Sequence, residues 1–387
     1  MRAILSRLWN TRLHFGRPKH ADVVIYDKVG ADELLPFLGN ARTAVLDLSG
    51  HSFNLWILIG MLLRGGRTMH DYAIRYLAWV QPRLVLTLID TTPFVYRIKN
   101  AHPHITVAAV QNGWRSIEFE RDLHRESEIE PLRADRVFCF GETAATLYRK
   151  YIDLEPTIIG SFRSNQVPVT PRPTDDLVVL VSTIRPKVNL DAPALDHLGR
   201  PTVAYRVIYE RRMELATRVA AFCERNGLRM AIAGKDMDAS REQAFYGTAL
   251  ADSQVEWEFV PRTERLGNYA LIDKARIVVS SSSTLGYEAL ARGCRSAFFM
   301  LDPEVTGNPG ERFAWPAPLE DRGPFWTNFL DGDAIDEILE FLHHLSEDDW
   351  RSLHRQFVPR LIAGDQGNSK LVQFIESTTR RTSGIGA

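Results

Sequence analysis

The sequence of 387 residues has few cysteines, no long apolar run and almost no net charge. Its three cysteines lie far apart in apolar surroundings without CxxC spacing, which predicts reduced core residues in a cytoplasmic chain. No run of about 18 apolar residues is present, so no segment is expected to span a membrane. The formal net charge of -1 gives no electrostatic reason to expect a nucleic-acid partner.

Signature motifs of several enzyme classes are also missing. The chain has no GxxxxGK[ST], no GxGxxG after its first strand, no HExxH and no GxSxG. These absences argue against a P-loop NTPase, a typical dinucleotide oxidoreductase, a zincin and an α/β-hydrolase. The 11 histidines show no metal-ligand spacing, and we expect no metal.

The N-terminal segment, residues 1–21, is basic and has no acid at all. It lacks the apolar core and cleavage site of a signal peptide. Apolar side chains beside arginines in residues 1–20 suit peripheral attachment to an anionic inner membrane leaflet. The alternative interpretation is a helix that packs on its own protein or frays.

Short apolar runs alternate with helix-like patterns along the whole chain, as in sheets covered on both faces. The expected strands are 22–27, 43–48, 84–90, 106–111, 136–141 and 157–161, then 177–183, 228–235, 255–260, 276–281 and 294–300. A proline-rich stretch at 166–176 separates the two series. The fold class is therefore α/β, with two Rossmann-like, doubly wound parallel-sheet domains facing a cleft. We expect domains at 22–165 and 177–335, helices crossing back at 336–376 and a tail at 377–387.

The segment VVSSSSTLGYEALARG, residues 278–293, combines the end of a strand with the start of a helix. A helix N-terminus favours a phosphate, and hydroxyls of this loop add uncharged donors. The hydroxyl residues assigned to this site are Ser281, Ser282, Ser283 and Thr284. Helix capping is the alternative role, but one cap uses only one hydroxyl.

Glu288 lies one turn into the same helix. A capping box with Thr284 as cap needs an acid at position 287, which is Tyr287. Glu288 is therefore left for another partner, and a carboxylate is a natural acceptor for a ribose diol.

Another candidate loop, AIAGKDMD at 231–238, also follows a strand. Gly234 permits close approach to a ligand, and Lys235 carries a charge that neutralises a phosphate or a sugar carboxylate. Asp236 or Asp238 is a candidate nucleophile or base. The alternative is an ordinary helix start with a solvated lysine.

Two arginines follow other strands of the second series. Arg185 in VSTIRP and Arg262 in FVPR are candidate anion clamps or ordinary surface residues. The Gly/Pro-rich loop at 305–316 is either a mobile flap or an inert connection.

Polar residues after strands of the first series form the expected acceptor side of the cleft. Asp90 is a candidate base or a helix cap, and Glu118 is a further candidate base. The QNGW loop places the amides of Gln111 and Asn112 in the cleft, and Arg163 of GSFRSN joins them.

The combination of QNG, GSFRSN, a strand-end AGKD and SSSTLGYEALARG resembles bacterial surface-carbohydrate biosynthesis proteins with a GT-B-like fold. Within these, the chain is similar to retaining β-Kdo transferases, which use CMP-Kdo to build O-antigen and capsule glycans. The resemblance runs from about residue 22 to 300, and STLGYEALARG is its specific motif. Capsule enzymes of this kind carry His-Pro where this chain has Lys235 and Asp236.

The resemblance implies a role for each part of the cleft. Hydroxyls of 282–284 hold the CMP phosphate, Glu288 holds the ribose, and Lys235 lies near the phosphate or the Kdo carboxylate. Asp236 matches best the Asp that forms a covalent sugar adduct. A CMP-ulosonate donor, a glycan acceptor and no metal or other cofactor follow. A UDP-sugar or CDP-polyol donor and a non-catalytic sugar-binding protein remain the alternatives.

Overall fold

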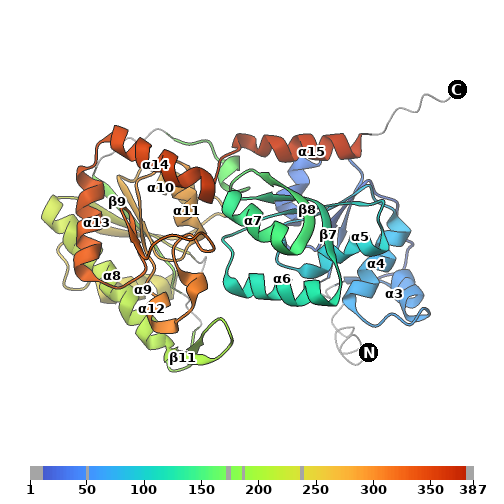
Figure 1. The fold of residues 1–387 in the computed structure, drawn as a ribbon, viewed down its shortest axis with the longest axis horizontal. Coiled ribbons are helices and arrows are strands. Elements are labelled where there is room, and N and C mark those ends of the chain that lie inside the picture. Colours follow the sequence, from blue (N-terminus) through green and yellow to red (C-terminus); the bar gives the residue numbers. More distant parts are fainter. Residues whose placement is uncertain (1–11, 49–51, 171–175, 185–187, 236–238, 381–387) are drawn as a thin grey trace.

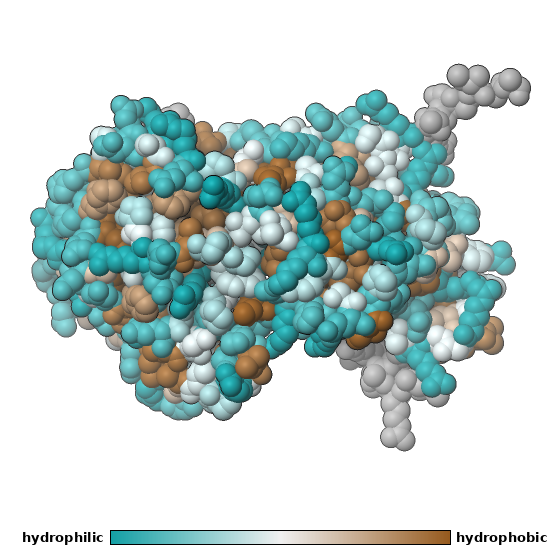
Figure 2. Space-filling model, in the orientation of Figure 1, coloured by the Kyte–Doolittle hydropathy of each residue, from teal (hydrophilic) through white to brown (hydrophobic). Residues whose placement is uncertain are grey.

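The computed structural model describes residues 12–48, 52–170, 176–184, 188–235 and 239–380. Two α/β domains lie side by side, each built around its own sheet (Figure 1). This confirms the expected fold class of two parallel-sheet domains. Figure 2 shows that hydrophilic residues dominate the face in this view, with apolar residues in separate small groups. Within the described ranges, no helix is both long and apolar enough to cross a membrane.

The N-terminal sheet contains six parallel strands in the order β3-β2-β5-β6-β7-β8. Their bounds are β2 Val23–Tyr26, β3 Thr43–Leu46, β5 Leu84–Thr87, β6 Thr106–Val110, β7 Leu132–Cys139 and β8 Ile152–Ile158. Because successive side chains face opposite sides of a strand, Val24 packs with one helix layer and Val23 with the other. Both faces are therefore covered, as the apolar strand sequences predict.

Strand β8 begins earlier than the expected strand at 157–161. It lies at the edge of the sheet, and its residues are mostly half-buried or exposed. An edge strand of this kind has no continuous apolar run, so the sequence pattern shows only its last part.

Helices of the N-terminal domain occupy both faces of this sheet. Their bounds are α2 Ala31–Leu34, α3 Leu55–Leu62, α4 Met69–Val80, α5 Ile98–Ala101, α6 Ile117–Ile129 and α7 Glu142–Tyr151. Buried residues of α3, α4, α6 and α7 form one core cluster with the sheet, and those of α2 belong to the other. A short parallel pair, β1 Arg12–His14 with β4 Ser52–Asn54, precedes α3.

The C-terminal sheet has the strand order β13-β12-β9-β14-β15-β17-β16, and only the β16–β17 pair is antiparallel. Its strands are β9 Leu177–Val181, β12 Arg229–Ala233, β13 Trp257–Val260, β14 Ile277–Ser280, β15 Ser296–Phe299, β16 Arg322–Gly323 and β17 Trp326–Thr327. A hairpin of β10 Pro193–Leu195 and β11 Pro201–Ala204 projects from this domain. Helices are α8 Tyr205–Asn226, α9 Ser240–Ala249, α10 Asn268–Ile272, α11 Thr284–Ala291, α12 Pro303–Thr306, α13 Gly332–His344 and α14 Glu347–Leu361.

The chain returns to the N-terminal domain through α15, Ser369–Thr379, which runs along that domain in Figure 1. Leu371 and Ile375 of α15 pack into the N-terminal core. Helix α13, which was also expected to cross back, instead packs into the C-terminal core because its apolar face meets α8 and β15. At the crossing, Asn165 Nδ2 donates to Asn368 Oδ1 at 3.0 Å, which fixes the return segment to the N-terminal domain.

Candidate functional site

A cleft of approximately 690 Å³ lies between the two domains. Its walls include loops that follow the strands β6 and β8 of one sheet and β9, β12, β13, β14 and β15 of the other. Open α/β sheets bind ligands beyond the carboxyl ends of their strands. The position of the cleft therefore agrees with the expected ligand site.

The hydroxyl-rich loop between β14 and α11 forms part of the C-terminal wall. Ser282, Ser283 and Thr284 line the cleft. Ser281 is buried beneath the loop, where its Oγ lies 3.3 Å from Thr183 Oγ1, so its role is structural rather than ligand binding. Ser283, and not Thr284, is the N-cap, and its Oγ accepts a hydrogen bond from Leu285 N at 3.3 Å.

Gly286 allows the first turn of α11 to lie against the end of β14. A Cβ at this position would lie 2.4 Å from both Cβ and Oγ of Ser280, which is too close for any side chain. Gly286 also occupies the position three residues after the Ser283 cap, where a capping box needs Glu or Gln. No capping box therefore forms, and Glu288 has no role in capping.

Glu288 is buried in the wall of the cleft, where its partners come from both domains. Ser161 Oγ donates to its Oε1 at 2.5 Å, and Tyr269 hydrogen-bonds to it as well. The pKa of Glu288 is raised above its ordinary value, because the effect of burial outweighs the opposing effects of these hydrogen bonds and of the charges of Arg163 and Arg292. The carboxyl group therefore lies in the cleft wall, held by hydrogen bonds from both domains.

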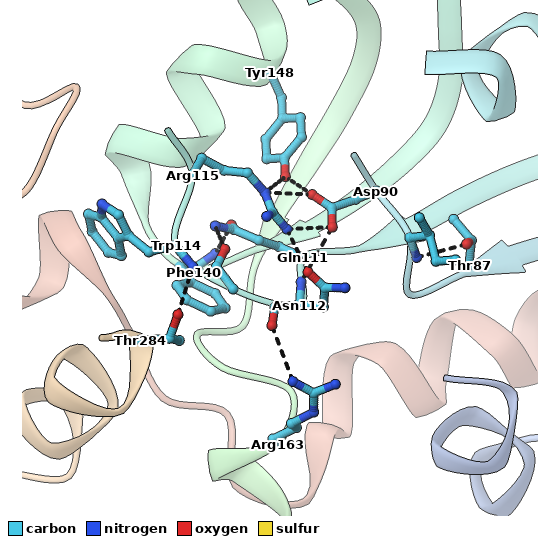
Figure 3. Close-up of polar contacts among 12 residues, drawn as sticks. Thr87, Asp90, Gln111, Asn112, Trp114, Arg115, Phe140, Tyr148, Arg163 and Thr284 are labelled. Atoms are coloured by element: carbon cyan, nitrogen blue, oxygen red, sulfur yellow. Dashed lines mark hydrogen bonds and ion pairs between the residues drawn. The ribbon is translucent and has the colours of Figure 1, made fainter. Parts of the chain in front are cut away.

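Loop QNGW docks the N-terminal domain onto α11. The Trp114 backbone N–H donates to Thr284 Oγ1 at 3.1 Å, and its indole stacks on Tyr287 with ring centroids 3.7 Å apart. Trp114 Nε1 also donates to the carbonyl of Trp315 at 3.1 Å. The phosphate-binding candidate Thr284 is thus held in place by a residue of the opposite domain (Figure 3).

Gln111 does not reach the cleft. Its Oε1 accepts from Phe140 N and its Nε2 donates to the Gly113 carbonyl, both at 2.9 Å. The amide therefore holds the end of β6 to β7, which corrects the expectation that it binds acceptor. Asn112 does line the cleft, and its Oδ1 accepts from Arg115 Nη2 at 3.0 Å.

Asp90 is wholly buried behind this loop and does not line the cleft. Arg115 pairs with it through two hydrogen bonds, of 2.8 Å from Nε and 2.5 Å from Nη2 (Figure 3). The hydroxyl of Tyr148 donates to the same carboxylate, and burial, followed by the Asp90 charge, raises the pKa of Tyr148 well above its usual value. With both oxygens occupied, Asp90 positions Arg115 and the QNGW loop, which corrects its assignment as a catalytic base.

Arginines of the cleft differ in how they are paired. Arg163 and Arg265 both bind the buried carboxylate of Glu33, at 2.7 Å each, which links the two domains. Arg163 is thereby committed to an ion pair within the N-terminal domain at the cleft wall, and Arg265 makes the link to the C-terminal domain. Arg262 also lines the cleft, and within the described ranges no carboxylate pairs with it. Its guanidinium donates to the Arg265 carbonyl at 3.0 Å.

Gly234 and Lys235 line the cleft at the end of β12. A Cβ on Gly234 would meet the Phe259 ring at 2.8 Å, so packing within the domain already requires glycine here. The Lys235 side chain is exposed, while its backbone N–H donates to both carboxylate oxygens of Glu242 at 3.1 Å. Asp236 and Arg185 lie outside the described residues, so their assignments stay predictions.

The loop after β15 adds cleft residues that sequence patterns did not single out. Glu311 lines the cleft, and Thr306 Oγ1 donates to its Oε2 at 2.6 Å. Burial, supported by the charges of Asp302 and Glu118, raises the pKa of Glu311 to about 7. Glu118 faces the same cleft and accepts from Asn308 Nδ2 at 3.0 Å.

The segment 305–316 lines the cleft and is therefore not an inert connection, whereas its role as a mobile flap stays a prediction. Gly310 lies so close to Ile117 that a Cβ would meet that side chain at 2.8 Å. The loop thus packs against the start of α6 and lines the cleft. The position of this loop after a strand of the second series was the sequence signal that could have identified Glu311. Arg212, which binds Asp302 at 2.7 Å, lies within α8, and no sequence motif marks it.

Two parallel-sheet domains with a polar cleft between them define a two-domain α/β protein of the Rossmann-like class. Its fold is similar to that of a "putative UDP-N-acetylglucosamine 2-epimerase" from Listeria monocytogenes, with a TM-score of 0.54 at 12% identity over 93% of this chain and 96% of that one. It is also similar to the UDP-GlcNAc 2-epimerase from Methanocaldococcus jannaschii, with a TM-score of 0.51 at 12% identity over 92% and 99% of the two chains. No curated protein matches the sequence.

A family model described as "putative O-antigen biosynthesis protein" matches residues 108–379. The chain belongs to this family, and the match includes both the QNGW loop and the hydroxyl-rich loop. The description of the family names O-antigen biosynthesis and does not name the Kdo specificity that the sequence resemblance implies.

Proposed function

We propose that this protein is a glycosyltransferase that moves Kdo, or a related ulosonic acid, from its CMP-activated form onto a surface glycan acceptor. Membership of the O-antigen biosynthesis family supports the biological setting. The observation that carries the proposal is the interdomain cleft, into which Ser282, Ser283 and Thr284 project at the start of α11. Helix N-termini with hydroxyl donors are suited to the phosphate of a nucleotide.

In this proposal the nucleotide lies along the C-terminal wall. The loop hydroxyls and the α11 dipole bind the phosphate, and Arg262 supplies a positive charge. Glu288 accepts from a ribose hydroxyl at the edge of the cleft. A nucleoside monophosphate leaving group carries less charge than a diphosphate, which is why neither a metal nor another cofactor is invoked.

The acceptor lies on the opposite wall, near Asn112 and Glu118. Retention requires two displacements: Asp236 first attacks the anomeric carbon and CMP leaves, then the acceptor hydroxyl displaces Asp236. The acceptor proton passes to a carboxylate of the cleft. Glu311 suits this role because a base works best when its pKa lies near the working pH.

Calorimetry with CMP, UDP and CDP tests the donor. We expect CMP to bind wild-type protein and to bind Arg262→Gln about tenfold more weakly, because a charge-assisted contact is lost. Arg225→Gln is the matched control, since Arg225 is an exposed arginine of α8 outside the cleft. Tight binding of UDP with none of CMP would overturn the Kdo assignment and favour a UDP-sugar enzyme.

Turnover and covalent chemistry are measured separately. CMP release from CMP-Kdo in the presence of acceptor supports transfer, whereas ligand binding without release indicates a sugar-binding protein. Intact mass after incubation with donor is expected to show a sugar adduct that Asp236→Asn abolishes. An adduct that persists in this variant contradicts the nucleophile assignment.

A further inference from the structure

Helix α3 presents large apolar side chains to the solvent. Trp56 is 52% exposed, Ile59 46%, Leu62 45% and Leu63, which follows the helix, 82%. Phe15, beside the same helix, is 67% exposed, and its carbonyl accepts a hydrogen bond from Trp56 Nε1 at 2.6 Å. We call these five residues the α3 face.

The α3 face is not explained by packing within the protein. Ile57, Leu58 and Met61 already anchor the other side of the helix in the N-terminal core. Surface helices normally carry polar residues on their solvent side, whereas LWILIGML is apolar all round. An exposed apolar group of this kind marks a site of contact with a partner or a membrane.

Basic residues surround the α3 face. Arg17 places its guanidinium 5.1 Å from the centre of the Trp56 ring and 5.6 Å from that of Trp79. The segment that pairs with the strand before α3 and the segment that follows α3 carry further exposed basic residues, which are Arg12, Lys19, Arg64 and Arg67. Residues 52–83 contain four arginines and one acid, Asp71, whose carboxylate is engaged in the capping box of α4.

We propose that the α3 face docks on an anionic lipid bilayer. Apolar side chains enter the boundary between headgroups and acyl chains, tryptophan favours that level, and arginines pair with lipid phosphates. Charge complementarity favours a bilayer as the partner. Its anionic headgroups match the basic residues, and its acyl region matches the apolar residues of the α3 face. Helix α3 lies at the end of the N-terminal domain far from the C-terminal domain (Figure 1), so docking leaves the cleft accessible.

The proposed membrane contact lies mainly on α3, whereas the sequence suggested the N-terminal segment. The sequence placed it on residues 1–20, of which 1–11 lie outside the described residues. Residues 12–19 contribute Phe15 and three basic side chains, and α3 supplies most of the apolar surface. The proposal does not depend on the donor or on the reaction in the cleft.

Sedimentation of the full chain with lipid vesicles tests the proposal. We expect binding to vesicles of phosphatidylcholine with phosphatidylglycerol, little binding to phosphatidylcholine alone, and weakening by salt. The variant Ile59→Glu with Leu63→Glu is expected to bind the anionic vesicles at least about tenfold more weakly. Its control is Ile129→Glu with Leu198→Glu, which adds the same charge at sites 68% and 54% exposed.

A second double variant keeps the proposal testable if the first one fails to fold. Arg64→Gln with Arg67→Gln leaves the apolar residues intact and is expected to lose about fivefold in affinity per arginine. Wild-type protein that stays in solution with anionic vesicles, or equal binding by the α3 variant and its control, overturns the proposal. Light scattering that shows a dimer dissociated by Ile59→Glu with Leu63→Glu also overturns it, because a second copy is then the occupant.

Discussion

Replacement of Asp90 by Asn separates a positioning role from a catalytic one. The carboxylate has no exposed surface, and Arg115, its partner, is 8% exposed. Asparagine preserves the shape but removes the charge that compensates the guanidinium. The Tyr148 hydroxyl also loses a charged acceptor.

The expected cost follows from the burial of this pair. Breaking a buried ion pair by neutralising one partner costs about 3–5 kcal/mol of folding free energy. Asp22→Asn provides the control, since Asp22, which is 16% exposed, pairs at 2.8 Å with Arg42, whose side chain is 55% exposed. A surface pair of this kind is worth about 0–1 kcal/mol.

Urea unfolding of the full chain, followed by tryptophan fluorescence, measures both variants. We expect a much lower midpoint for Asp90→Asn than for Asp22→Asn. CMP affinity should also fall, because Arg115 holds the loop that contacts Thr284. An Asp90→Asn protein as stable as wild type, with CMP affinity unchanged and transfer abolished, would contradict the positioning role and identify Asp90 as a base.

Three further predictions concern the cleft. The pKa of Glu311 is raised from 4.5 to about 7, so its stabilising contribution is full below about pH 4.5 and is lost as pH rises through about 7. Glu311→Gln should remove this dependence and be up to roughly 3 kcal/mol more stable than wild type at alkaline pH, measured by urea unfolding across pH; an unchanged profile contradicts this. Gly286→Ala should destabilise by about 1–3 kcal/mol through its clash with Ser280 and weaken CMP binding; wild-type melting and affinity would show that the loop adapts. Arg262→Gln should weaken CMP binding about tenfold while Arg225→Gln does not, and equal affinities would remove Arg262 from the phosphate site.

The alternation of apolar runs predicted the two parallel-sheet domains because strands covered on both faces must be apolar throughout. Strand β8 was only partly recognised because an edge strand with half-exposed residues lacks that signal. The packing of α13 against the C-terminal domain was not predicted, for a related reason. An apolar helix face shows that a helix packs, but not which sheet it packs against.

Strand-end positions correctly directed attention to the cleft, and Ser282, Thr284 and Asn112 line it. The same rule misplaced Gln111 and Asp90, because their side chains turn back to bind Phe140 and Arg115 of the same domain. Such partner choices depend on residues distant in sequence. The raised pKa of Glu311 is likewise a product of tertiary burial, which no local pattern reports.

A crystal structure of the protein with CMP is the decisive test of nucleotide binding in the cleft. We expect the CMP phosphate against Ser282, Ser283 and Thr284 at the start of α11, with the ribose toward Glu288 and Arg262 nearby. CMP bound elsewhere on the surface, or a cleft that takes UDP and excludes CMP at the same concentration, would contradict it.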